Sequence, residues 1–174
     1  MGKISGHEPV KLIVGLIGQE ELFEKTRKAL LKKFGKIDFI SPVIAFNFTD
    51  YYNAEMGSNL KRQFLSFKKN IVCEDLVPIK HFTNKLEKKF YSPGSRRQVN
   101  IDPGYLNLSK LVLATTKDHQ HRLYLGKGIF AEVTLRFRHK SFIGWEWTYP
   151  DYLSLAYIEI FNHIRNNLFA GKKA

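Results

Sequence analysis

Short β-type runs and amphipathic helical segments follow one another along this chain in an order that few architectures satisfy. In the first half, strands are predicted at about 10–17, 37–48 and 60–72, and helices at about 19–34 and 76–90. The predicted strands are short and mostly rich in branched apolar residues, whereas the helices repeat apolar residues every three or four positions. With a strand after the second helix, the order β-α-β-β-α-β fits a split βαβ, ferredoxin-like arrangement.

The second half of the chain is rich in β-type runs. Strands are predicted at about 98–102, 109–116, 121–126 and 128–138, with another at 141–147, and a last helix at about 152–168. Gly126-Lys127-Gly128 marks the turn of a hairpin. We therefore expect one α+β domain over residues 1–174, with a mixed, largely antiparallel sheet and helices packed on one face.

Charge, cysteine content and apolar runs restrict the partners and the location that the chain can have. The net charge is +12, from 28 Lys and Arg against 16 Asp and Glu, and this favours phosphorylated or polyanionic partners. The single Cys73 excludes an intrachain disulfide and a cysteine zinc site. No apolar run approaches the roughly 20 residues of a membrane span, and the N-terminus lacks an apolar signal core. These features predict a cytoplasmic protein with no membrane partner.

Polar residues able to do chemistry gather at the ends of the predicted strands between Arg97 and Tyr152. The sequence Asp-Pro-Gly-Tyr at 102–105 is typical of a type II turn, in which Asp102 would only begin the turn. A second interpretation adds Asn100, because residues 100 and 102 point the same way on a strand. An amide and a carboxylate would then project together as a metal or ribose contact.

The strand at 128–138 carries a carboxylate, Glu132, on the side opposite its predicted core face. Glu132 either pairs with Arg136 in solvent or, if a second layer covers that side, becomes a buried base or metal ligand. His121 is either a proton shuttle or a histidine bonded to backbone. Alternation predicts that Arg122 faces away from His121, and its guanidinium suits a phosphate.

These considerations give a candidate site. Catalytic roles are predicted for Asp102, Glu132 and His121, and Asp102 and Glu132 would also bind Mg²⁺. Predicted ligand contacts are Asn84, Glu87, Arg97, Asn100, Tyr105, Lys117, Arg122 and Asp151. Three of these residues also have simpler explanations. Asp151 can cap the last helix, and Asn84 and Glu87 can belong to the rim of a packed helix.

Several segments resemble an uncharacterised prokaryotic family of unknown function (DUF4416-like), whose members are often labelled GTP-binding proteins. The similar segments are FNFTDYYNAEMG (46–57), TNKLE (83–87), RQVNIDPGY (97–105), KLVLATTKDHQHRLYLGKGIFAEVTL (110–135) and WTYPDY (147–152). The resemblance implies a polar site around these segments and supplies no reaction. The chain has no G-x-x-x-x-G-K-[ST] loop, and Thr116-Lys117-Asp118 is one residue short of the guanine motif of GTPases.

Two hypotheses of different class follow. In the first, the polar site binds a small phosphoryl-bearing ligand such as a nucleotide, with or without turning it over. In the second, the chain is a non-enzymatic RNA- or DNA-binding module whose surface includes Phe64, Phe67 and the basic segment 136–140. A structural or partner-binding domain is a third reading, and the sequence leaves the oligomeric state open.

Overall fold

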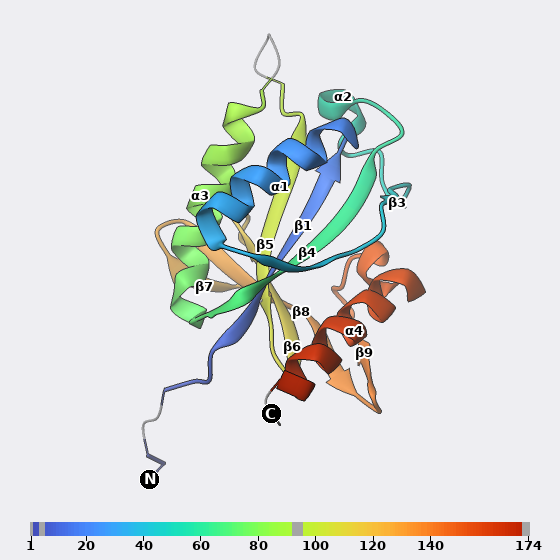
Figure 1. Cartoon of the computed structure of the whole chain (residues 1–174). Helices are drawn as coiled ribbons and strands as arrows, with labels where there is room; N and C mark the ends of the chain where they lie inside the picture. Colours follow the sequence, from blue (N-terminus) through green and yellow to red (C-terminus); the bar gives the residue numbers. More distant parts are fainter. Residues whose placement is uncertain (1, 4–5, 92–95, 172–174) are drawn as a thin grey trace.

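Nine strands form one sheet in the computed structural model, which describes residues 2–3, 6–91 and 96–171 (Figure 1). The strand order is β2-β4-β1-β5-β6-β8-β7, with β3 beside β4 and β9 beside β8, and every strand pair in this described part is antiparallel. The strands are β1 (Val10–Gly18), β2 (Ile37–Ile40), β3 (Ile44–Ala45), β4 (Lys61–Ile71), β5 (Val99–Leu106), β6 (Lys110–Thr115), β7 (Leu123–Gly126), β8 (Ile129–Arg138) and β9 (Ser141–Ile143). The helices are α1 (Glu21–Phe34), α2 (Asn53–Met56), α3 (Leu76–Lys89) and α4 (Leu155–Gly171).

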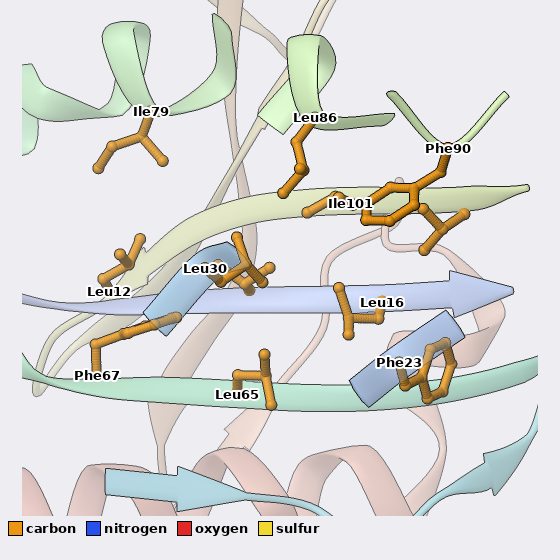
Figure 2. Close-up of a cluster of buried hydrophobic side chains, with 12 residues drawn as sticks. Leu12, Leu16, Phe23, Leu30, Leu65, Phe67, Ile79, Leu86, Phe90 and Ile101 are labelled. Atoms are coloured by element: carbon orange, nitrogen blue, oxygen red, sulfur yellow. The ribbon is translucent and has the colours of Figure 1, made fainter. Parts of the chain in front are cut away.

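The first half has the ferredoxin-like arrangement that the element order predicts. Strands β2-β4-β1-β5 lie in that order, and in Figure 1 α1 crosses in front of β1, β4 and β5 while α3 lies beside it on the left. Figure 2 shows the core between these two layers, with Leu12 and Leu16 of β1 facing Leu30 of α1 and Leu86 of α3. The α+β class and the largely antiparallel sheet are therefore confirmed.

The opposite face of the sheet is covered by α4, so the helices are not confined to one face. Ile13 and Phe64 point away from the first core and pack with Tyr157 and Phe161 of α4. All nine residues of β1 are buried. A strand buried on both faces needs a layer on each side, and the apolar run from Leu12 to Ile17 was the signal for this.

Two local predictions in the second half are wrong. Residues 102–105 do not turn, because they continue β5, and Asp102 pairs with Gly15 of β1. The predicted single core face of β8 is divided by a register shift between Leu111 and Val112 of β6. Before the shift Ile129 packs with Val112 beneath α3, whereas after it Leu135 packs in the core beneath α4.

Shorter elements differ in detail from the sequence-based expectation. The strand predicted at 37–48 is two short strands, β2 and β3, and Asp151 lies in a 3-10 turn before α4. The hairpin turn is confirmed, since Gly126, Lys127 and Gly128 join β7 to β8 with positive φ. In the residues described, no helix is both long and apolar enough to cross a membrane.

The sheet opens between β5 and β6, and this opening positions the site. The two strands pair only from Gly104 to Leu106 and from Leu111 to Leu113. Residues 99–103 of β5 pair with β1 but not with β6. Gly104 permits the close approach where pairing begins, since a Cβ there would lie 2.3 Å from the Val112 carbonyl oxygen. Beyond that point the strands separate.

Candidate functional site

A pocket of about 760 Å³ lies at the opening between β5 and β6. Its walls come from α3, the segment 46–52, the ends of β5 and β6, the loop after β6 and the 3-10 turn before α4. Among the residues that the structure describes, seven Lys or Arg residues line it: Arg62, Lys80, Lys85, Lys88, Arg97, Lys117 and Arg122. Four carboxylates, Glu87, Asp102, Glu132 and Asp151, and seven aromatic side chains complete its chemistry.

Two side chains of α3 satisfy the unpaired edge of β5. The Ile101 amide donates a hydrogen bond to Glu87 Oε1 at 2.6 Å. The Lys80 ammonium donates to the Ile101 carbonyl oxygen and to Asp102 Oδ1, both at 3.4 Å. Buried backbone groups need such partners when a neighbouring strand is absent. Glu87 and Lys80 therefore keep the sheet open at the place where the pocket forms.

Burial raises the pKa of Glu87 to about 7, although Lys80 and the Ile101 amide act in the opposite direction. Arg97 lies nearby, with Nη1 3.7 Å from Glu87 Oε2. Arg97 also donates to Glu55 Oε2 at 2.8 Å and to Asn100 Oδ1 at 2.8 Å. The pocket thus holds a carboxyl group that exchanges its proton near neutral pH.

A deeply buried cation of the pocket is Arg62 of β4, whose side chain is only 3% exposed. Its Nη2 donates to Asp151 Oδ2 at 2.8 Å and its Nε to the Tyr157 hydroxyl at 3.3 Å. Its Nη1 lies 3.9 Å from Asp102 Oδ2 and has no hydrogen-bond partner among the described residues. Burial alone would lower the pKa of Arg62, but nearby Tyr152, Tyr157, Asp151 and Asp102 outweigh it, so the net pKa lies above its ordinary value.

Asp151 therefore has a different role from the predicted helix cap. Its carboxylate faces Arg62, and α4 begins after the turn without a side-chain cap from Asp151. Sequence reasoning missed Arg62 altogether, because it sits in a basic cluster that resembles a solvated face. The signal for its burial was its position in the strand, because four of the next five residues are apolar or small.

A second buried ion pair joins Glu132 to Arg122. Glu132 Oε2 accepts hydrogen bonds from Arg122 Nε at 3.0 Å and contacts His121 Nε2 at 3.0 Å. The prediction that His121 and Arg122 face apart is wrong, because both precede β7 and lie in a turn where strand alternation does not apply. Glu132 is 3% exposed, so it is the buried carboxylate of the two alternatives rather than a solvated partner of Arg136.

The guanidinium of Arg122 is fully engaged in this cluster. Its Nη1 donates to the Lys117 carbonyl oxygen at 3.1 Å, and its Nη2 donates to the Tyr149 hydroxyl at 3.3 Å. His121 stacks on Trp147, with ring centroids 5.4 Å apart. Arg122 thus holds the loop after β6 against the turn before α4, and few of its donors remain for a ligand.

The structure brings most of the predicted site residues together. The pocket is lined by nine of them: Asn84, Glu87, Arg97, Asn100, Asp102, Lys117, Arg122, Glu132 and Asp151. Asn100 and Asp102 do project together, and the Asn100 amide donates to Asp102 Oδ2. Tyr105 and His121 do not line this pocket. Tyr105 points to the other face of β5 and packs beneath the start of α3.

Other lining residues escaped the sequence analysis. They are mainly aromatic or basic side chains on α3 and in the segment 46–52, such as Lys80, Lys85, Lys88, Tyr51 and Tyr52. The surface predicted for nucleic acid is wrong in part, because Phe64 and Phe67 are fully buried in the two cores. Both lie on β4, where alternating residues are covered by helices on either face.

Metal binding by Asp102 and Glu132 stays a prediction. Within the described residues, no group of three or more His, Cys, Asp or Glu side chains is placed to hold a metal ion. Asp102 contacts Lys80 and Arg62, and Glu132 contacts Arg122 and His121. Each carboxylate thus already faces cationic side chains, which compete with a metal for its charge.

Fold and site together define a class of protein: an antiparallel α+β domain with a cation-rich pocket at an opening in its sheet. The chain belongs to the family described as Domain of unknown function (DUF4416), whose model matches residues 8–168. This confirms the resemblance seen in the sequence. Comparisons with curated proteins and with solved structures gave no match.

Proposed function

We propose that the pocket binds a small phosphoryl-bearing ligand, such as a nucleotide. The observation that carries this proposal is the excess of cations, since seven Lys and Arg residues face four carboxylates. The pKa of about 7 for Glu87 reduces the negative charge further near neutral pH. A positive cleft with low-dielectric walls raises the local concentration of anions.

The cations available to a phosphate lie at the rim of the pocket. Lys85 and Lys88 are exposed on α3, and their ammonium groups form no ion pair or hydrogen bond with the residues that the structure describes. Lys117 lies in the loop across the opening and donates to the Tyr51 hydroxyl at 3.0 Å. Lysine ammonium groups of this kind bind phosphate as point charges.

The aromatic walls suit a planar group attached to the phosphate. Tyr51, Tyr52 and Phe48 line the pocket from the segment 46–52, and Tyr149 lines it from the residues before the 3-10 turn. Tyr51 and Tyr149 are half or more exposed, so their rings are accessible from solvent. Stacking on such rings stabilises a bound base by about 1–3 kcal/mol. The volume of about 760 Å³ lies within the range of ligand pockets, roughly 300–1,000 Å³.

Turnover of the ligand would need a group that exchanges a proton near pH 7. Glu87 lines the pocket and has a pKa of about 7, so it is the candidate for this role in place of His121, which lies outside the lining. Asp102 and Glu132 keep the roles proposed from the sequence, as catalytic groups and as ligands of Mg²⁺.

Isothermal titration calorimetry with nucleoside mono-, di- and triphosphates and ribose 5-phosphate, with and without Mg²⁺, tests the proposal. The Lys85→Gln/Lys88→Gln double variant should bind the best ligand at least about tenfold more weakly, since two charge-assisted contacts are lost. A matched control is Lys68→Gln/Lys69→Gln, which removes the same charge from exposed positions outside the pocket. Equal weakening in both variants, or no binding of any phosphorylated compound, would contradict the proposal.

Binding to RNA or DNA is the alternative, and it is supported by the net charge of +12. Filter binding over a range of salt concentrations tests it, because counterion release makes such binding fall steeply with salt. Salt-insensitive retention, or none, counts against this alternative.

A further inference from the structure

The charges of the pocket are separated by depth. In the interior, Arg62 pairs with Asp151 and Arg122 pairs with Glu132, and all four side chains are less than a tenth exposed. Arg62 and Arg122 are therefore neutralised by fixed partners. At the rim, Lys85 and Lys88 are exposed and have no acidic partner among the described residues. A phosphate is thus attracted to the rim and gains little from the interior.

Asp102 is the most accessible of the four carboxylates. Its side chain is 26% exposed, compared with 10% for Glu87 and 8% for Asp151. Asn100 donates to its Oδ2, and Lys80 lies 3.4 Å from its Oδ1. A carboxylate has about four acceptor positions, so Asp102 keeps free acceptor capacity toward the pocket.

The surroundings of Asp102 decide which chemical group it can accept. Asp151 and Asp102 would repel a phosphate here, whereas Lys80 and Arg62 would repel an ammonium group. A neutral donor avoids both penalties. A hydroxyl group also offers an acceptor, and Lys80, whose contacts with Asp102 and Ile101 are both long, has donor capacity to spare.

From this arrangement we propose that the ligand enters with a sugar facing inward, so that adjacent hydroxyl groups bind Asp102 and Lys80 while its phosphate stays at the rim with Lys85 and Lys88. This inference rests on the proposed function and adds the orientation and the class of ligand, a sugar phosphate or ribonucleotide. The Asn100 amide, which donates to Asp102, and the Arg62 guanidinium, 3.9 Å from it, position the carboxylate.

Calorimetric titrations of the wild-type protein with matched ligand pairs test the inference. The pairs are ribose 5-phosphate with 2-deoxyribose 5-phosphate, and the four nucleoside 5′-monophosphates with their 2′,3′-dideoxy counterparts. Loss of the hydroxyls should weaken binding by about tenfold or more, because a hydrogen bond to a charged group is lost. In Asp102→Asn, which keeps the side-chain shape, this discrimination should shrink, whereas the Lys85→Gln/Lys88→Gln variant should keep it.

The possible outcomes bear differently on the sugar-inward inference and on the proposed phosphate binding. Equal affinity for the hydroxyl and deoxy forms overturns the sugar-inward inference and leaves phosphate binding intact. Binding of free ribose or of unphosphorylated nucleosides as tight as that of the phosphorylated forms overturns the role of the phosphate and its contacts at the rim, and leaves only the hydroxyl contacts with Asp102 and Lys80. Binding of none of these probes overturns both. The ligand comparison uses wild-type protein, so it remains decisive even if Asp102→Asn folds poorly.

Discussion

Arg62 is buried among the rings of Phe46, Phe64, Tyr152 and Tyr157, each 5–6 Å from its guanidinium carbon. Removing one partner of a buried ion pair leaves the other charge uncompensated, which costs about 3–5 kcal/mol. We therefore expect Arg62→Met to lower the free energy of unfolding by about that amount, measured by urea denaturation.

The double variant Arg62→Met/Asp151→Asn distinguishes the ion pair from simple packing. Because the uncompensated Asp151 charge is removed, most of the lost stability should return. If the double variant is as unstable as Arg62→Met alone, the loss comes from packing of the guanidinium between the rings. The exposed pair Lys28–Glu24 on α1 is a control, and Lys28→Ala should leave stability nearly unchanged.

Glu87 gives the protein a characteristic pH dependence. Burial raises its pKa from 4.5 to about 7 in the folded state, so the folded chain holds a proton that the unfolded chain has released between these values. Stability therefore falls as the pH rises from about 4.5 to 7, and it is unaffected by this group below 4.5. Glu87→Gln removes the titration and keeps an acceptor for the Ile101 amide.

Relative to the wild type, Glu87→Gln should therefore gain stability as the pH rises from 4.5 to 7.5. The gain is on the order of 3 kcal/mol, since one unit of pKa corresponds to about 1.4 kcal/mol. Denaturation curves of the two proteins at several pH values measure it. A difference between the two proteins that does not vary with pH would show that the pKa of Glu87 is close to its ordinary value.

At single positions, sequence periodicity could predict the direction of a side chain, because that direction depends on neighbours in the chain. The shared direction of Asn100 and Asp102 follows from the two-residue repeat of a strand, and it is confirmed. Asp151 pairs with Arg62, which lies 89 positions earlier in the chain, and Glu132 pairs with Arg122, which lies 10 positions earlier. No local pattern reveals these partners. His121 and Arg122 were assigned opposite directions because a strand was predicted to begin two residues too early.

At the level of elements, the pairing of β5 with β6 depends on one glycine. A Cβ at Gly104 would approach the Val112 carbonyl oxygen to 2.3 Å, and that oxygen belongs to a paired strand that cannot move freely. Gly104→Ala should lower the free energy of unfolding by about 1–3 kcal/mol or more, as overpacking does in well-packed interiors. Thermal or chemical unfolding measures this loss.

Gly144 supplies a matched comparison for this substitution. A Cβ there would meet Leu153 Cδ2 at 2.2 Å, but the contact is the end of a flexible, half-exposed side chain. Gly144→Ala should therefore cost clearly less than Gly104→Ala. A larger loss of stability for Gly144→Ala than for Gly104→Ala would show that β5 and β6 can move apart at Gly104 at little cost.

Elements and their order were largely predictable, whereas their contacts were not. The helical periodicity of α1 and α3 and the apolar run of β1 reflect burial, which the sequence records directly. The turn predicted at 102–105 was wrong because strand pairing with β1 overrides the local preference of Pro103 and Gly104. The register shift between β6 and β8 has no composition signal, and it changes which residues of β8 face each core.

At the scale of the whole molecule, the two main cores share strands. Leu12 and Leu65 lie in the core beneath α1 and α3, whereas Ile13 and Phe64 of the same strands lie in the core beneath α4. Loss of β1 or β4 would expose both cores, so we expect one cooperative unfolding transition. Fluorescence of Trp145 and Trp147 and far-ultraviolet circular dichroism should give the same midpoint. Two separate midpoints would indicate that the halves fold independently.

The walls of the pocket come from both halves of the chain. Lys80, Glu87 and Asp102 belong to the ferredoxin-like half, whereas Lys117, Glu132 and Tyr149 come from the strands and loops that follow it. A molecule that contacts both walls acts as a clamp between them, and its binding energy adds to the resistance of the native state to heat and proteases. Neither half alone carries all of the residues that line the pocket, so a fragment of either half would lack a complete binding surface.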